Sequence, residues 1–129
     1  MAQHTRQDTA LIRKYIETVK LLNMYLNHFP NHEKYALCNQ IRTTAYRIYD
    51  LITEGVKRYQ KKTTLRNLDI AHQQLRMQLH LAFELGYFKF RDGAKVEKAN
   101  PQERFMKISA LVDELGRMIG AWVKKFEAT

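Results

Sequence analysis

The stretch that decides the fold is residues 100–126, which read NPQERFMKISALVDELGRMIGAWVKKF. It opens with Asn100, Pro101 and Glu103, the order in which an N-cap side chain, a proline at the first helical position and a capping glutamate begin a helix. Apolar side chains then recur every three or four residues and form one face, made of Phe105, Ile108, Val112, Leu115, Ile119, Trp122, Val123 and Phe126. This pattern predicts a long amphipathic helix that buries one face against other helices.

Three earlier segments carry the same helical period, over about residues 8–27, 31–60 and 65–85. Pro30 ends the first, because the residue before a proline is pushed out of the α region. Residues 61–64 (KKTT) read as a turn with a threonine available as N-cap. The apolar stripes comprise Leu11, Tyr15, Thr18 or Val19, Leu22 and Leu26; then Leu37, Ile41, Ala45, Ile48, Ile52, Val56 and Tyr59; and then Leu68, Ala71, Leu75, Leu79 and Ala82.

Four helices of about 20 residues with short connections predict an all-α fold, an antiparallel up-down-up-down four-helix bundle. The chain of 129 residues fits one domain over residues 1–129, with a short flexible start at about residues 1–7. Residues 91–99 are predicted to form a charged loop, and residues 86–90 either extend the preceding helix or leave it.

Composition excludes several classes of protein. A single cysteine, Cys38, excludes an internal disulfide and a cysteine-based zinc site, and it is best explained as a small buried residue. No run of 18 apolar residues and no apolar leader occur, so we expect a cytoplasmic protein that contacts no membrane. Five glycines and two prolines are too few for the turns of a β-sandwich.

The net charge of +9, from 22 Lys and Arg against 13 Asp and Glu, indicates a polyanionic partner, and nucleic acid is the commonest one. The cations lie within the helical segments, so they decorate a folded surface. The candidate contacts to nucleic acid or a partner are Arg42, Arg47, Lys57, Arg58, Lys61, Lys62, His72, Arg76, His80, Lys107, Arg117 and Lys124. Candidates for stacking on unpaired bases are Tyr46, Tyr49, Tyr59 and Tyr87. The alternative is that these cations only solvate the outside of a bundle.

The histidines do not favour a metal site or a cofactor. His28 and His32 straddle a proline, and the Glu-x-x-His pairs of di-iron bundles do not occur. A catalytic alternative remains open, because Arg66 and His72 match the Arg-x(4–6)-His spacing of HEPN-type ribonucleases, in which arginine and histidine act on the scissile phosphate.

Three glycines interrupt predicted helices, and each costs about 1 kcal/mol relative to alanine. At Gly55 close packing is a plausible reason. Gly116 and Gly120 open a smooth strip four residues apart, where another helix can approach. That helix belongs either to the same bundle or to a second protomer, and the sequence leaves both alternatives open.

Several of these segments resemble a known family. Residues 29–37, FPNHEKYAL, followed by Gln40, Ile41 and Arg42, resemble the junction of the first two helices in a group of four-helix bundles that includes proteins encoded in ribosomal RNA intervening sequences. Residues 68–76 and 113–122 (DELGRMIGAW) are similar to the third helix and the C-terminal block of Avd, the accessory variability determinant of diversity-generating retroelements. The resemblance covers about residues 10–125.

The resemblance implies a non-enzymatic accessory subunit. Avd proteins are four-helix bundles that form a positively charged homopentameric barrel, bind the retroelement reverse transcriptase and nucleic acid, and support mutagenic cDNA synthesis on the template RNA. Arg76 and Arg117 match basic residues at the family's charged surface, whereas His80 stands where a relative has arginine. The alternatives are a general RNA-associated bundle of the intervening-sequence type and a HEPN-like ribonuclease.

Overall fold

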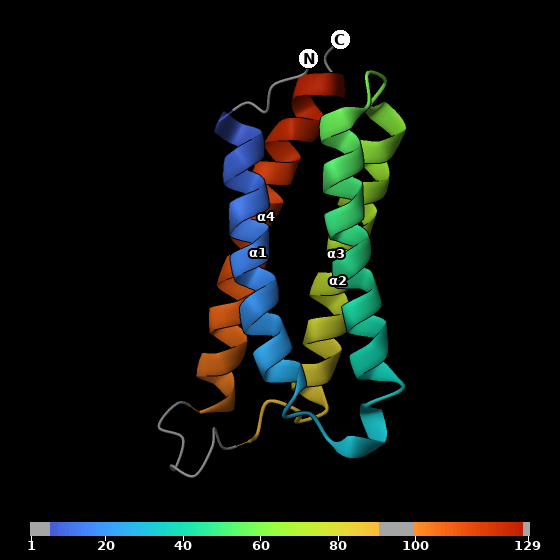
Figure 1. Cartoon of the computed structure of the whole chain (residues 1–129). Coiled ribbons are helices and arrows are strands. Elements are labelled where there is room, and N and C mark those ends of the chain that lie inside the picture. The colour runs from blue at the N-terminus through green and yellow to red at the C-terminus, as the bar shows by residue number, and fades with distance from the viewer. Residues whose placement is uncertain (1–5, 91–99, 128–129) are drawn as a thin grey trace.

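The computed structural model describes residues 6–90 and 100–127. Within them the chain forms the helices α1 (Arg6–Leu26), α2 (Leu37–Lys57), α3 (Lys62–Glu84) and α4 (Pro101–Glu127), and the 3-10 turn η1 (Asn31–Glu33). Successive helices run in opposite directions (Figure 1). α1 and α3 each pack against both α2 and α4, so the described residues confirm the predicted antiparallel four-helix bundle.

The predicted boundaries are displaced around the first connection. α1 begins at Arg6, and residues 1–5 of the predicted flexible start lie outside the described residues. The second helix was expected from residue 31, but Ala36 adopts φ −117° and ψ −102°, which separates η1 from α2. The Glu33 carboxylate accepts a hydrogen bond from the backbone N–H of Leu37 at 3.3 Å and so caps the start of α2. The sequence did not predict this break, because the break depends on the position of the Glu33 carboxylate, which the distant Tyr87 hydroxyl also contacts.

At the second connection the predicted threonine N-cap is wrong. α3 begins at Lys62, and the hydroxyl of Thr64 donates to Glu54 of α2 at 2.7 Å. α2 ends at Lys57 because Arg58 turns to an extended conformation. The Lys61 ammonium then donates to the carbonyls of Gly55 (2.7 Å) and Val56 (3.4 Å), two of the acceptors that the end of α2 leaves unpaired.

The end of α3 settles the alternatives for residues 86–90. Gly86 has φ +82°, a left-handed conformation that favours glycine. Its N–H donates to Phe83 and the N–H of Tyr87 donates to Ala82, which is a Schellman ending. The segment therefore leaves the helix, and Phe88 is buried against Tyr25 and Phe105. The charged loop predicted over residues 91–99 lies outside the described residues.

The predicted start of α4 is confirmed. The side-chain oxygen of Asn100 accepts a hydrogen bond from the N–H of Glu103 at 2.8 Å, and Pro101 is the first helical residue.

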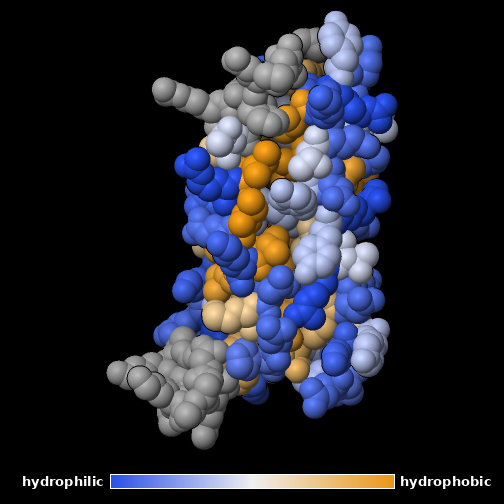
Figure 2. All heavy atoms as spheres, viewed as in Figure 1, coloured by the Kyte–Doolittle hydropathy of each residue, from blue (hydrophilic) through white to orange (hydrophobic). Residues whose placement is uncertain are grey.

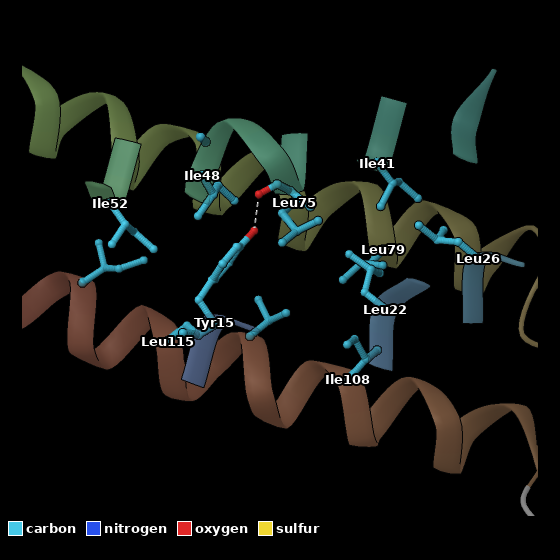
Figure 3. Close-up of a cluster of buried hydrophobic side chains, with 14 of the residues drawn as sticks. Tyr15, Leu22, Leu26, Ile41, Ile48, Ile52, Leu75, Leu79, Ile108 and Leu115 are labelled. Carbon is cyan, nitrogen blue, oxygen red and sulfur yellow. Dashed lines mark hydrogen bonds between the residues drawn. The ribbon is translucent and has the colours of Figure 1, made fainter. Parts of the chain in front are cut away.

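The four apolar stripes meet in one core (Figure 3). Tyr15 reaches from α1 across this core, and its hydroxyl donates to the carbonyl of Ala45 at 2.6 Å. Burial raises the pKa of this phenol. Tyr59 was predicted to continue the stripe of α2, but it lies beyond the end of that helix and is 94% exposed. The buried stripe residues include Leu11, Leu22, Leu26, Ile41, Ile48, Ile52, Leu68, Leu75, Leu79, Ile108, Leu115, Ile119 and Trp122.

Two small residues have the packing roles expected of them. A Cβ added to Gly55 would lie 2.9 Å from the ring of Trp122 and 3.3 Å from Leu65, so α2 approaches its neighbours closely at this point. Cys38 is buried, and its thiol donates to the carbonyl of Leu26 at 3.6 Å. Burial raises the pKa of this thiol.

Candidate nucleic-acid interface

Cations from three helix ends gather at one end of the bundle. α2 ends, α3 begins and α4 ends there (Figure 1). The Lys61 ammonium lies 5.5 Å from the centre of the Phe126 ring, which places the end of α4 beside the turn between α2 and α3. We call this set the end cluster: Lys57, Arg58, Lys61, Lys62, Lys124 and Lys125.

The end cluster presents a positive surface to solvent. All its members except Lys61 are exposed. The Arg58 guanidinium lies 3.9 Å from the Glu54 carboxylate, and an ion pair exposed to solvent in this way contributes little to stability. The N-cap residue of α3 makes no side-chain hydrogen bond to that helix, so the first N–H groups of α3 add positive partial charge to the same surface. Tyr59 stands among these cations and is 94% exposed, which suits stacking on an unpaired base.

Two members of the end cluster differ from the sequence prediction. Lys61 was predicted to contact nucleic acid, but its ammonium is held by backbone carbonyls of α2. Lys125 was not predicted as a contact, although it is exposed beside Lys124. Its position in the last turn of α4 could have indicated an exposed cation beside Lys124, because cations are favoured at helix C-termini.

Four more predicted cations are exposed along the helices: Arg76 and His80 lie on the exposed side of α3, and Lys107 and Arg117 lie on α4. The guanidinium of Arg76 lies 3.1 Å from the Asp113 carboxylate, and the His80 ring lies 3.5 Å from Glu84. These partners offset the charge at Arg76 and, when it is protonated, at His80. The long side of the bundle is thus less strongly positive than the end cluster.

His72 was predicted to lie on this side with Arg76 and His80, and that prediction is wrong. Its side chain is buried, and Nε2 lies 2.7 Å from the carbonyl of Val112 in α4. Since His72 is six residues from Arg66, the two point to different sides of α3. A buried ring bonded to a backbone carbonyl does not face a phosphate, so the structure does not favour the HEPN-like alternative.

At position 116 only glycine leaves room for the buried His72 ring. A Cβ at position 116 would lie 2.8 Å from Cε1 of His72 and 3.1 Å from the Arg76 guanidinium. For Gly116 the contact is therefore within the bundle. A Cβ at Gly120 meets no described atom within 4 Å, so the bundle itself does not require that glycine.

Some of the remaining predicted contact residues are exposed to solvent, and others are hydrogen-bonded within the bundle. Arg42 donates to Asn23 at 3.2 Å and to Asn27 at 2.7 Å, so it ties α2 to α1 and is not a free phosphate ligand. The hydroxyl of Tyr87 donates to Glu33 at 2.6 Å. The exposed members are Arg47, Tyr46 and Tyr49, of which Tyr49 stacks on Tyr15.

The buried His72 makes stability depend on pH. Burial, more than any other effect, lowers the pKa of His72 below its usual 6.5, and nearby Arg76 lowers it further, although the Val112 hydrogen bond raises it. The unfolded chain therefore binds a proton at higher pH than the folded chain does. Stability should be intact above about pH 6.5 and fall as the pH drops below that value, by at most about 1.4 kcal/mol per pH unit. Urea unfolding of the wild type and His72→Gln between pH 7.5 and 5 measures this, and equal slopes for the two would contradict it.

The described residues offer neither a metal site nor a membrane span. No group of three or more His, Cys, Asp or Glu side chains among them is placed to hold a metal ion. No helix in the described part of the chain is long and apolar enough to cross a bilayer.

Comparison with protein families identifies the chain. A family model described as bAvd-like matches residues 10–126, a range that spans the core of all four helices and the end cluster. The search of curated proteins found no match. Because the family model covers far more than half of the chain, this protein belongs to the bAvd-like family, an Avd-type family.

Proposed function

We propose that this chain is a non-enzymatic accessory subunit of a diversity-generating retroelement. In this proposal it assembles as a homopentamer, binds the reverse transcriptase of the element and contacts the template RNA during mutagenic cDNA synthesis. Membership of the bAvd-like family supports the accessory role. No cofactor is needed, because the mechanism is to hold nucleic acid and polymerase together on a rigid charged scaffold.

The end cluster is the observation that best supports a contact with nucleic acid. Phosphates are bound by cations held at fixed positions on a folded surface, and three helix ends supply such cations here. The exposed Tyr59 adds a stacking surface that every base can use. In an oligomer the end cluster of each copy is repeated, so one RNA strand can engage several clusters at once.

The first experiment is light scattering combined with an RNA-binding titration. A pentamer gives a mass near 76 kDa, five times the 15.3 kDa of one chain. Binding of a fluorescent single-stranded RNA should weaken steeply between 50 and 200 mM salt, because each phosphate contact adds about 0.7 to the log–log slope. A monomer whose RNA affinity does not respond to salt would contradict both parts of the proposal.

A general RNA-associated bundle of the intervening-sequence type fits the same end cluster and is the second candidate. Co-expression with the reverse transcriptase of a diversity-generating retroelement separates the two. Co-purification at 150 mM salt favours the accessory role, whereas RNA binding without capture of the polymerase favours the general bundle.

A further inference from the structure

An apolar groove runs along the boundary between α1 and α2 (Figure 2). It has a volume of about 420 Å³, and Ile16 (41%), Tyr46 (49%) and Tyr49 (37%) are exposed along it. We call this the α1–α2 groove. Its lining residues are Ile16, Val19, Lys20, Asn23, Tyr46, Tyr49 and Asp50.

A row of apolar side chains projects from α3, on another face of the bundle. Ile70, Met77 and Leu81 are 53%, 54% and 49% exposed. Their spacings of seven and four residues place them in one line along the helix. We call this line the α3 ridge, and the side chains that flank it, Gln73 and Gln74, are uncharged and exposed.

The charge of these two surfaces suits contact between copies of the same chain. Copies that each carry +9 repel one another, so they can meet closely only where cations are sparse or balanced. The α3 ridge with its flanking glutamines is uncharged, since Arg76 in the same stretch turns toward Asp113 of α4. The lining of the α1–α2 groove holds one cation, Lys20, and one anion, Asp50, so its formal charge is zero. Interface cores are depleted of charge in this way and enriched in tyrosine and methionine.

We propose that the α3 ridge of one copy lies in the α1–α2 groove of the next. This inference rests on the proposed homo-oligomer and names the two surfaces that build it. Met77 enters between Asn23 and Tyr46, and the amides of Gln73 and Gln74 pair with Lys20 and Asp50 across the rim. Because each copy offers a ridge on one face and a groove on another, the contact is heterologous: each copy binds two neighbours.

The heights of the two surfaces favour a closed ring over a filament. α1 and α3 begin at the same end of the bundle (Figure 1). With a rise of 1.5 Å per residue, the groove residues of α1 lie about 15–26 Å from that end and the α3 ridge about 12–29 Å from it. The two ranges overlap, so ridge and groove can meet without the shift along the bundle axis that would build a filament.

Directed cross-linking tests this pairing in the full chain. The buried Cys38 is first replaced (Cys38→Ala), and Tyr46→Cys and Met77→Cys are then made separately in that background. After oxidation, an equimolar mixture that has been allowed to exchange subunits should give a covalent dimer on a non-reducing denaturing gel, while each variant alone runs on that gel at the 15.3 kDa of one chain. A chain carrying both changes should give a ladder of cross-linked species. If either variant alters the assembly before oxidation, Ile16→Cys and Ile70→Cys, which lie at similar heights along the bundle, replace the pair.

A charge on the α3 ridge gives an independent measurement. Met77→Glu should shift the light-scattering mass from the oligomer to the single chain. The matched control is Met106→Glu, which alters a methionine that is 68% exposed on α4, outside both surfaces, and should leave the mass unchanged.

The outcomes separate this inference from the proposed function. An oligomeric wild type with no cross-link between positions 46 and 77, or with cross-links within either single variant, overturns the pairing and leaves the oligomer intact. A wild type that is monomeric overturns both the pairing and the proposed oligomer, while the RNA titration still tests the end cluster by itself.

Discussion

Reversing two cations of the end cluster, Lys62→Glu with Lys124→Glu, is expected to weaken binding of single-stranded RNA roughly fifty-fold at 50 mM salt. The estimate follows from two lost phosphate contacts, each of which lowers the slope of log affinity against log salt by about 0.7. Both side chains are exposed and come from different helices, so the change removes charge without opening the core. Fluorescence anisotropy measures the affinity, and circular dichroism checks that helical content is unchanged.

Stability should change little in this double variant. A glutamate at Lys62 sits in the first turn of α3, where a negative charge is favoured, whereas a glutamate at Lys124 sits in the last turn of α4, where it costs about 0.3–1 kcal/mol. Lys34→Glu with Lys89→Glu is the matched control, because it changes the net charge by the same amount and both residues are exposed cations at the opposite end of the bundle. An equal loss of affinity in this control would mean that overall charge, and not the end cluster, determines binding.

Arg117→Glu extends the comparison to the long side of the bundle. Arg117 is exposed on α4, and its reversal should weaken RNA binding by less than the double change in the end cluster. Arg76 is a poorer choice, because a glutamate there would face Asp113, which lies 3.1 Å from the guanidinium. A larger loss in Arg117→Glu would move the principal nucleic-acid contact from the end of the bundle to its side.

Gly55→Ala is expected to lower the free energy of unfolding by up to about 2 kcal/mol. The new Cβ would stand 2.9 Å from the Trp122 ring and 3.3 Å from Leu65, so the packed helices must separate slightly. Overpacking of this kind costs about 1–3 kcal/mol, and the better helix propensity of alanine returns about 1 kcal/mol of that. Urea denaturation followed by circular dichroism measures the difference.

Gly120→Ala is the matched control for that experiment. No described atom lies within 4 Å of a Cβ at this position, so alanine should raise the free energy of unfolding by up to about 1 kcal/mol through helix propensity. If Gly55→Ala were as stable as Gly120→Ala, the contact with Trp122 would be loose enough to absorb a methyl group.

Local patterns in the sequence were sufficient to predict that the four helices form and which face of each is buried. Asn100, Pro101 and Glu103 start α4 as predicted, because an N-cap depends on residues within one turn. The apolar stripes predicted the core for the same reason: a period of 3.6 residues assigns each side chain an angle around its own helix. Tyr59 broke the pattern because α2 had already ended, and boundaries depend on neighbours as well as on the local sequence.

Only the tertiary structure decided what each polar side chain of the candidate site does. Positions four residues apart differ by about 40° around a helix, so His72, Arg76 and His80 span about 80° and run from a buried face to an exposed one. The sequence determined that Lys61 and Arg42 are cations, but a lysine can cap a helix or bind a phosphate, and the choice depends on the backbone carbonyls or amides within reach. The end cluster likewise brings together residues 57–62 and 124–125, whose separation along the chain carries no information about distance until the four helices pack.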